Sequence, residues 1–211
     1  MVKSRGMEKS IIMDEIQSML YQSRDGVFSV WLGLKEVIKE KDLIKVFLLI
    51  NKYYPQYYIK SDDYISERKS WEEYLISNFN YIPSSFNSIF LSAKFYIQNE
   101  KGELMMIEPE DDGIEIIYGS DNDSPVFGIQ FYPYVYFDLN KIYYRDDDSS
   151  VIKFKMVDQS LAAKKNRAIL SAFLKDLEEL FNTNISFFQA GKKYSPNYVY
   201  KYGFKEDVVL Y

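Results

Sequence analysis

The chain has 211 residues, which is enough for one large domain or two small ones and for a substantial buried core. It contains no cysteine and no histidine, which excludes disulfides, thiolate and imidazole metal sites, and the Ser-His-Asp and Cys-His catalytic arrangements. Its formal net charge of −5 disfavours nucleic acid as a partner and favours a basic protein surface.

The beginning of the chain does not have the pattern of a secretion signal. Asp14 and Glu15 interrupt its short apolar stretch, and no small-residue cleavage site follows. No apolar run approaches the roughly 20 residues that a membrane-spanning helix needs. We therefore expect a cytoplasmic location.

The N-terminal part, residues 8–82, is predicted to be mostly helical. Apolar residues recur at helical spacing within residues 8–23. Asp42 is placed to cap a second helix, which Pro55 would end. Ser70 is followed three residues later by a glutamate, the capping-box pattern at the start of a third helix.

Residues 88–157 are predicted to form a β meander. A first hairpin is expected from an alternating run at 90–98, a turn over Asn99–Gly102 and a returning strand from Glu103. Short turns also separate the later segments, so antiparallel neighbours are expected. The later strands are expected at 113–118, 126–132, 134–139, 141–145 and 151–157.

A long helix over about residues 160–182 is predicted next. Its continuous apolar stripe, which includes Leu170, Phe173, Leu174 and Leu177, would lie across the inner face of the sheet. Short C-terminal strands would follow. The sequence therefore predicts a single α+β domain over residues 1–211, with an N-terminal helical layer, a largely antiparallel sheet of five or more strands and one long helix packed across that sheet.

Nucleotide-binding signatures are absent from the chain. Its nine glycines form no GxGxxG motif, and Gly191-Lys192 is followed by Lys193, where a phosphate-binding loop needs Ser or Thr. The GxSxG nucleophile elbow is also missing. We expect no cofactor, and no catalytic residue is assigned.

Three acidic clusters have the oxygen ligands that Mg²⁺ or Ca²⁺ prefers. Because they lie between predicted strands, where carboxylates cap turns and keep edges soluble, no metal site is expected. Glu67-Arg68-Lys69 has the spacing of a metal-dependent nuclease triplet, but it precedes a predicted helix cap instead of lying on a strand. The clusters are Glu108, Glu110, Asp111 and Asp112; Asp121 and Asp123; and Asp146, Asp147 and Asp148.

Two basic stretches raise the alternative of a protein that binds single-stranded nucleic acid. In the second stretch, lysines alternate with tyrosines that could stack on bases. The net acidity of the chain and the ordinary β propensity of tyrosine count against this reading. The stretches are Lys164, Lys165 and Arg167, and Lys192, Lys193, Lys201 and Lys205.

We interpret the chain as a non-enzymatic protein-binding module. Its 20 tyrosines suit contact surfaces. An acidic chain without the common catalytic groups suits an inhibitor or immunity-type protein that neutralises a partner, which is an analogy from composition. A single-stranded nucleic-acid-binding protein, a carboxylate- and metal-dependent phosphodiesterase and a structural subunit remain as alternatives.

The partner-binding site is predicted on a tyrosine-rich, acidic part of the β region. If residues 134–139 form a strand, Tyr134 and Tyr136 share its outward face, while Val135 and Phe137 pack inward. The neighbouring aspartates would steer a basic partner, and the tyrosine rings would anchor it. The predicted site comprises Tyr134, Tyr136, Tyr143, Tyr144, Asp146, Asp147 and Asp148.

Overall fold

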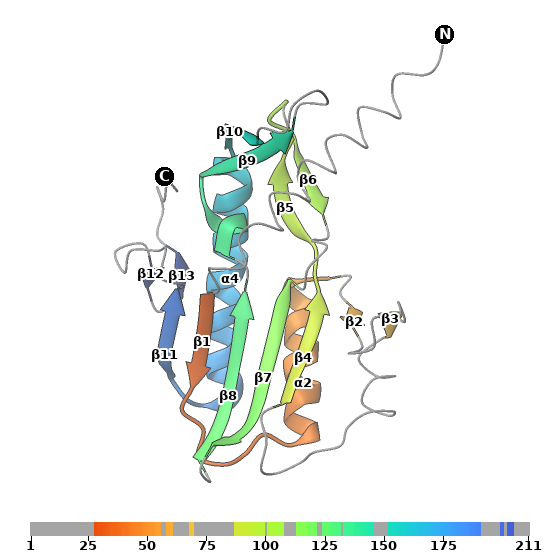
Figure 1. Ribbon diagram of the computed structural model, residues 1–211. Helices are drawn as coiled ribbons and strands as arrows, with labels where there is room; N and C mark the ends of the chain where they lie inside the picture. The colour runs from red at the N-terminus through yellow and green to blue at the C-terminus, as the bar shows by residue number, and fades with distance from the viewer. Residues whose placement is uncertain are drawn as a thin grey trace.

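The protein is an α+β chain, as the sequence predicts, and its described residues form an antiparallel sheet of several strands and two α-helices (Figure 1). The computed structural model describes residues 28–55, 58–60, 68–69, 87–99, 101–107, 113–121, 124–131, 133–145, 152–190, 199–200 and 202–204.

The main sheet has seven strands in the order β11-β1-β8-β7-β4-β2-β3, and all its neighbours are antiparallel. β1 lies between β8 and β11, so the first and the last third of the described chain share one sheet. The strands are β1 (Phe28–Leu32), β2 (Tyr58–Lys60), β3 (Arg68–Lys69), β4 (Asn87–Ser92), β7 (Ile114–Asp121), β8 (Ser124–Phe131) and β11 (Ile185–Ala190). A separate short pair is formed by β12 (Val199–Tyr200) and β13 (Gly203–Phe204).

One face of the sheet carries rows of buried apolar side chains. The register aligns Val30, Ile129, Ile116 and Ile89 across four neighbouring strands. All four are buried. Because side chains alternate between the two faces of a strand, this row and the parallel row that contains Phe131 define the inner face.

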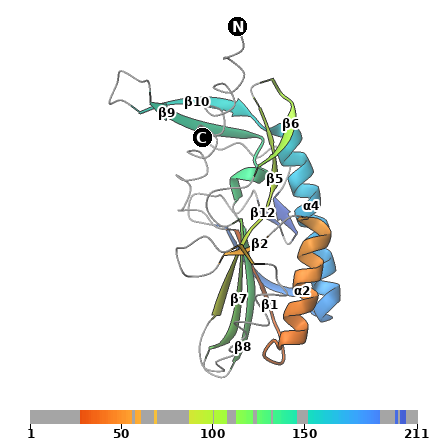
Figure 2. The ribbon, with the colours of Figure 1, turned by 90° about the vertical axis from the view of Figure 1, so that its right-hand side faces the viewer.

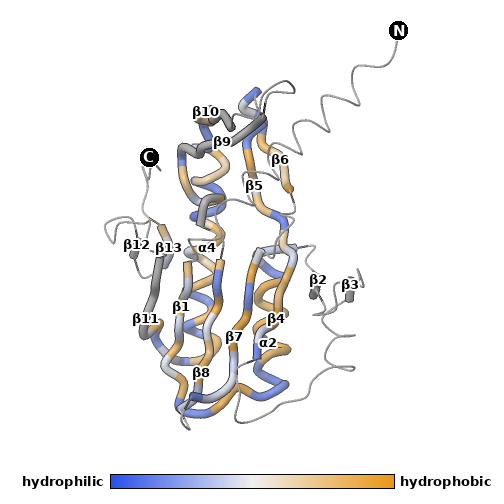
Figure 3. Tube along the Cα trace, in the orientation of Figure 1, coloured by the Kyte–Doolittle hydropathy of each residue, from blue (hydrophilic) through white to orange (hydrophobic). Residues whose placement is uncertain are grey.

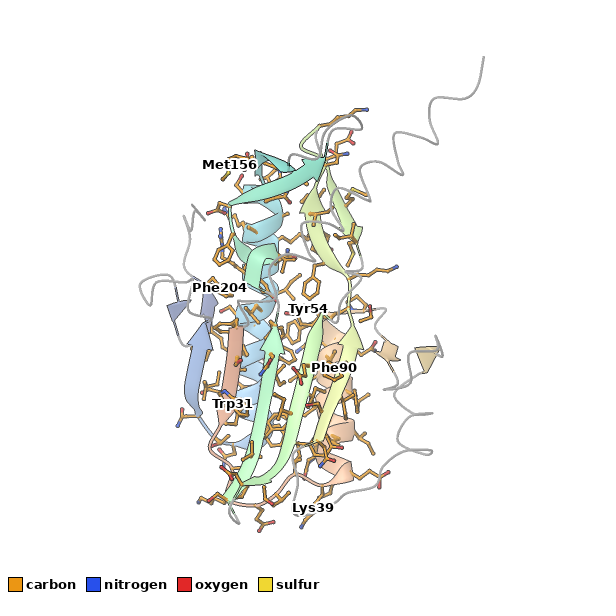
Figure 4. The ribbon with its side chains drawn as sticks, in the orientation of Figure 1. Trp31, Lys39, Tyr54, Phe90, Met156 and Phe204 are labelled. Carbon is orange, nitrogen blue, oxygen red and sulfur yellow. The ribbon has the colours of Figure 1, made fainter. Side chains whose placement is uncertain are left out.

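The opposite face of the sheet includes a tight contact between Trp31 and Gly128. These residues are partners in the register of β1 and β8. A Cβ placed on Gly128 would lie only 2.5 Å from the indole ring, so glycine is required there. Trp31 on β1 and Phe90 on β4 are half-buried and can be followed in Figure 4.

The helix α2 (Glu40–Tyr53) confirms the helix predicted between Asp42 and Pro55. Asp42 lies in its first turn, where the carboxylate accepts a hydrogen bond from the Lys39 backbone N–H at 3.2 Å. This bond satisfies one of the free N–H groups at the start of the helix. The buried face carries Leu43, Val46, Phe47 and Ile50, which recur at helical spacing.

The helix α4 (Ser160–Phe181) confirms the predicted long helix. It ends at Asn182, whose φ of 47° places it in the left-handed region that commonly closes helices. α2 and α4 lie side by side against the same face of the sheet (Figures 1 and 2). Asp176 of α4 joins the two helices on the solvent side, because its Oδ2 lies 2.6 Å from both Lys52 Nζ and the Tyr53 hydroxyl.

Both helices alternate polar and apolar residues along their length, as surface helices do (Figure 3). Phe173 of α4 lies where α2, α4 and the sheet meet. Its ring makes contacts with Tyr53, Tyr54 and Phe131, with centroid separations of 6.0, 5.8 and 5.8 Å. Edge-on contacts of this kind stabilise a core beyond the burial of their area.

Two hairpins and a short helix lie beyond the main sheet, at the end of the molecule where α4 begins (Figure 1). α4 reaches this end because its 22 residues span about 33 Å. We call this region the hairpin end. Its elements, besides the first turns of α4, are β5 (Phe95–Gln98), β6 (Leu104–Ile107), the 3-10 helix η1 (Pro133–Tyr136), β9 (Leu139–Arg145) and β10 (Ile152–Asp158).

The β9–β10 hairpin begins and ends at one place. The register pairs Leu139 with Asp158, the first residue of one strand with the last of the other. Immediately outside that pair, the Gln159 N–H donates to the Asp138 carbonyl at 2.8 Å. The polypeptide therefore returns to its starting point before α4 begins.

The N-terminal part of the chain is less helical than the sequence predicts. β1, β2 and β3 all fall within residues 8–82, so the prediction of a mostly helical segment is wrong for them. β1 was missed because periodicity cannot decide between helix and strand over five residues, four of them apolar. The helices predicted within residues 8–23 and from Ser70 lie outside the described residues.

We expect Phe173→Ala to lower the free energy of unfolding by about 3 to 5 kcal/mol, because it removes a fully buried ring at the junction of both helices and the sheet. Urea denaturation followed by circular dichroism measures the change. Lys164→Ala, at an exposed position of the same helix, is the control and should change stability by less than about 0.5 kcal/mol. Equal stability of the two variants would contradict the assignment of Phe173 to the core.

Candidate functional site

Of the predicted site residues, the structure describes the side chain of Tyr136 alone. Tyr136 is 0% exposed, so the prediction that it faces outward is wrong. Residues 133–136 form η1 instead of a strand, and Pro133 suits the first turn of a helix. Strand alternation therefore does not apply, and Val135, Tyr136 and Phe137 are all buried.

The other predicted site residues are placed only by their backbone or not at all. Tyr134 lies in η1. Tyr143 and Tyr144 lie in β9, where the register pairs them with Phe154 and Lys153. Asp146, Asp147 and Asp148 lie outside the described residues. A partner-binding role for these residues stays a prediction.

Tyr136 belongs to an aromatic cluster at the boundary between the main sheet and the hairpin end. Its ring stacks on Phe204 at 5.3 Å and meets Phe95 edge-on at 6.4 Å. Tyr54, at the end of α2, lies in the same cluster through its contact with Phe95 at 5.7 Å. Figure 4 shows Tyr54 and Phe204 in the middle of the molecule.

The hydroxyls of Tyr54 and Tyr136 are buried and lie close enough for each to affect the other's ionisation, although their geometry falls short of a hydrogen bond. Burial raises the pKa of both phenols, and that of Tyr136 rises well above its usual value of 10.0. Both therefore stay protonated in the folded protein across the ordinary alkaline range.

A different group of side chains forms an exposed apolar surface at the hairpin end. Among the described residues, five large apolar side chains are well exposed, and four of them belong to β6, β10 and the first turn of α4. The four are Leu104 (43%), Met106 (39%), Met156 (39%) and Leu161 (56%), and the fifth is Leu48 (53%) of α2. Figure 4 labels Met156 at this end.

The side-chain amides of Asn166 on α4 and of Gln159, the residue just before α4, hold β5 in place beside this surface. Asn166 bonds both backbone groups of Tyr96, with its Oδ1 accepting from the N–H at 3.1 Å and its Nδ2 donating to the carbonyl at 2.8 Å. Gln159 bonds both backbone groups of Gln98 in the same way, with its Oε1 accepting from the N–H at 2.8 Å and its Nε2 donating to the carbonyl at 2.9 Å. The two amides thus occupy the edge of β5 that a neighbouring strand would otherwise pair with.

The contact is reciprocal, because Gln98 caps α4. Its Oε1 accepts from the backbone N–H of Leu161 at 2.8 Å, which satisfies a free donor in the first turn of the helix. Asn166 also donates to the Val135 carbonyl at 2.7 Å, and this bond attaches η1 to the same helix. We call these contacts of Gln98, Gln159 and Asn166 the amide clamp.

Arg167 completes the polar attachment of η1. Its Nη1 donates to the Tyr136 carbonyl at 2.9 Å and its Nη2 to Asp138 Oδ1 at 2.8 Å. The side chain is only 9% exposed. Of the basic stretch that raised the nucleic-acid alternative, only Lys164 and Lys165 are therefore exposed.

The register places the exposed residues of β6 on the same face as the first turns of α4. Leu104 pairs with Gln98 and Met106 with Tyr96, and paired residues point to the same side of a hairpin. The Gln98 side chain reaches the backbone of Leu161, and Lys165 Nζ lies 3.8 Å from the centre of the Tyr96 ring. We call Tyr96, Leu104, Met106, Leu161 and Lys165 the end surface.

Carboxylates near the end surface are engaged in local bonds. Glu103 Oε2 accepts from Asn99 Nδ2 at 2.8 Å, and Asp158 Oδ1 accepts from the Ser160 backbone N–H at 2.9 Å. Lys101 in the β5–β6 turn is exposed, as is Lys165. Both carboxylates keep their negative charge, so charges of both signs lie near the end surface, and Lys165 is the one placed over Tyr96 on the face of Leu104 and Met106.

Sequence reasoning missed the end surface, although β6 carried a usable signal. Its residues Leu104–Ile107 are all apolar, without the alternation expected of a strand with one solvent face (Figure 3). Such a run in a short hairpin indicates either burial on both faces or exposed apolar contact groups. Only the structure decides between the two.

Metal and membrane sites find no support in the part of the chain that the structure describes. No three acidic residues there are grouped so that they could hold a metal ion, and most of the acidic clusters noted in the sequence lie outside it. Arg68 and Lys69 form β3, so the argument that their triplet does not lie on a strand is wrong for these two residues. No described helix is long and apolar enough to cross a membrane.

Comparisons with known proteins add no relatives. The chain matches no protein-family model, no curated protein and no solved structure.

We expect the buried phenols to make stability fall at alkaline pH. In the unfolded chain they ionise near pH 10, whereas in the folded protein they stay protonated. Their contribution is fully present below pH 10 and is lost as pH rises above it, by about 1 kcal/mol per phenol at pH 11. Urea denaturation at pH 8 to 11 should show a smaller loss for the double variant Tyr54→Phe, Tyr136→Phe. Identical losses would contradict the burial of these hydroxyls.

We expect Asn166→Leu to destabilise the hairpin end. The change leaves the Tyr96 N–H, the Tyr96 carbonyl and the Val135 carbonyl without their partner, at a cost of about 2 to 4 kcal/mol. Hydrogen exchange measured by NMR should show the Tyr96 amide exchanging faster. The amides of β8, in the main sheet, should exchange no faster than the change in the global free energy of unfolding accounts for. Unchanged protection at Tyr96 would show that the amide clamp is not what holds β5.

Proposed function

We propose that this protein works by binding another protein and that the end surface makes the contact. The main observation is that four of the five well-exposed large apolar side chains among the described residues lie at the hairpin end, and three of them, Leu104, Met106 and Leu161, belong to the end surface. Isolated exposed apolar residues are ordinary, but a group of them at one place commonly marks an interaction site. Leucine and methionine side chains also adapt readily to different partners.

The rigid support of this surface favours binding over a purely structural explanation. The amide clamp fixes β5 to α4, and Arg167 with Asp138 fixes η1 to the same helix. A contact surface whose elements are already ordered loses less conformational entropy on association. The polar bonds at the hairpin end therefore help to keep apolar groups presented to solvent.

Within protein binders, we propose an inhibitor or immunity-type protein that neutralises its partner in the cytoplasm. The support for this class is compositional: the chain is acidic, rich in tyrosine and free of histidine and cysteine. The net charge of −5 would speed the encounter with a partner that is basic overall. The end surface would then supply the short-range apolar contacts that slow dissociation.

The test compares three variants that each place a glutamate at an exposed leucine. Leu104→Glu and Leu161→Glu lie on the end surface, and Leu48→Glu on α2 is the matched control because the exposed fraction of Leu48 lies between those of the other two leucines. Partners are captured from the native host with the parent protein and identified by mass spectrometry. We expect both end-surface variants to bind the purified partner at least about tenfold more weakly, a loss of about 1.4 kcal/mol, and the control to bind normally.

The outcome is decided by the pattern across the variants, after thermal melts confirm that all three are folded. Equal binding by all three would place the contact elsewhere, and Tyr134, Tyr143, Tyr144 and Asp146–Asp148 would be tested next. Loss of binding in the Leu48 variant alone would place it on the exposed side of α2. Hydrolysis of a substrate by the parent protein, abolished by carboxylate substitutions, would overturn the proposed class altogether.

A further inference from the structure

The backbone of β6 has an edge that faces away from its only neighbour in the described part of the chain. In an antiparallel pair, the N–H and the carbonyl of one residue point to the same side of the strand. The N–H and carbonyl of Tyr96 bond to Asn166, on the side of β5 away from β6. Its partner Met106 therefore directs its own N–H and carbonyl away from β5.

The same reasoning applies one pair further along. The backbone N–H and carbonyl of Gln98 both form hydrogen bonds with the Gln159 side chain. The N–H and carbonyl of its register partner Leu104 therefore also point away from β5. Between these pairs, the backbone N–H and carbonyl of Met105 point toward β5. The same alternation accounts for the turn, where the Asn99 N–H donates to the Glu103 carbonyl at 3.0 Å. Leu104 and Met106 thus offer alternating donors and acceptors on the outer edge of β6.

This edge is short, with four residues, but it lacks other features that proteins commonly use to block strand pairing. β6 contains no proline, no charged residue and no bulge in its pairing with β5. The residues whose backbone groups face outward are also the two whose side chains are well exposed, Leu104 and Met106. One short strand therefore presents both main-chain hydrogen-bonding groups and apolar side chains.

We propose that β6 is a strand-addition site: an extended segment of a partner protein pairs with its outer edge, with apolar side chains packed on Leu104 and Met106 and an acidic side chain directed at the positive charge beside them. The proposal rests on the proposed function and specifies how its contact is made. Main-chain bonds supply affinity in this mode of recognition, and alternate side chains supply specificity.

The charge at the site selects the chemistry of the added segment. Lys165 lies over Tyr96, the register partner of Met106, and Lys101 stands in the adjoining turn. Glu103 and Asp158 keep their negative charge nearby, so the acidic side chain is expected to pair with Lys165, which lies on the face that carries Met106. A second copy of this chain would instead add its own lysines to the same place, and like charges oppose that pairing.

Proline substitution separates strand addition from ordinary side-chain docking. Met106→Pro removes an outward N–H that makes no bond to β5, and proline is tolerated at such edge positions. Met106→Ala removes the same side-chain contacts but keeps the N–H. Circular dichroism melts establish that both variants are folded, and hydrogen exchange provides a second measurement that needs no variant.

The probe is a display library of random peptides of about ten residues, panned on the parent protein. We expect enrichment of sequences that alternate apolar and acidic residues. A synthetic enriched peptide should lose about threefold in affinity on Met106→Ala and at least about thirtyfold on Met106→Pro. Adding the peptide should also slow hydrogen exchange at the Leu104 and Met106 amides of the parent protein.

Other results overturn the proposal in distinguishable ways. Equal losses with alanine and proline, with unchanged exchange at Leu104 and Met106, would leave the end surface as a side-chain contact and remove strand addition. Enrichment of basic peptides would refute the acidic segment. A parent protein that sediments as a dimer, made monomeric by Met106→Pro, would assign the edge to a second copy. The site would be refuted if no peptide is enriched, or if Leu104→Glu does not abolish the binding of any enriched peptide.

Discussion

The hairpin end of this protein depends on three side-chain amides. A two-stranded hairpin with four residues in each strand is marginal by itself in water. β5 and β6 are nevertheless ordered, because Gln159 and Asn166 bond the free edge of β5 and Gln98 caps α4 in return. Each partner satisfies backbone groups that the other would leave unpaired. The hairpin and the first turn of the helix therefore stabilise each other.

The amide clamp also explains why one edge of the hairpin is closed and the other open. Pairing by Gln159 and Asn166 uses the hydrogen-bonding groups of Tyr96 and Gln98 and leaves those of Leu104 and Met106 facing outward. A third strand on the outer side of β6 would extend this small sheet in the usual antiparallel or parallel manner. The contact of β5 with α4 and the outward direction of the β6 backbone groups thus both follow from the register of β5 and β6.

Sequence reasoning succeeded where the signals were local. α4 carries its stripe of Leu170, Phe173, Leu174 and Leu177 in consecutive turns, and the turn at Asn99–Gly102 is followed by a confirmed return strand. β1 was not predicted, because its place depends on pairing with residues more than 90 positions away in β8 and β11. Nothing within a five-residue segment encodes such long-range pairing.

The candidate site could be predicted only in fragments. Lys164 and Lys165 were noticed, but as part of a stretch whose third member, Arg167, is buried against Asp138. Tyr136 was assigned to an exposed strand because alternation is a reliable guide only when a strand forms, and Pro133 begins a helical turn there instead. The outward direction of the backbone groups of Leu104 and Met106 follows from the amides that bond the other edge of β5, which composition does not reveal.

The closed base of the β9–β10 hairpin has a consequence for how this protein can change over evolution. Residues 139–158 leave the fold beside Asp138 and return to the same point, where the Gln159 N–H bonds the Asp138 carbonyl. Because the ends are already joined, lengthening or shortening the excursion changes the entropy of loop closure only slightly. Met156, an exposed apolar residue, lies on this hairpin. Homologous chains could therefore vary the length and the sequence of this segment, including the exposed apolar residue that it carries, while α4 and the main sheet stay unchanged.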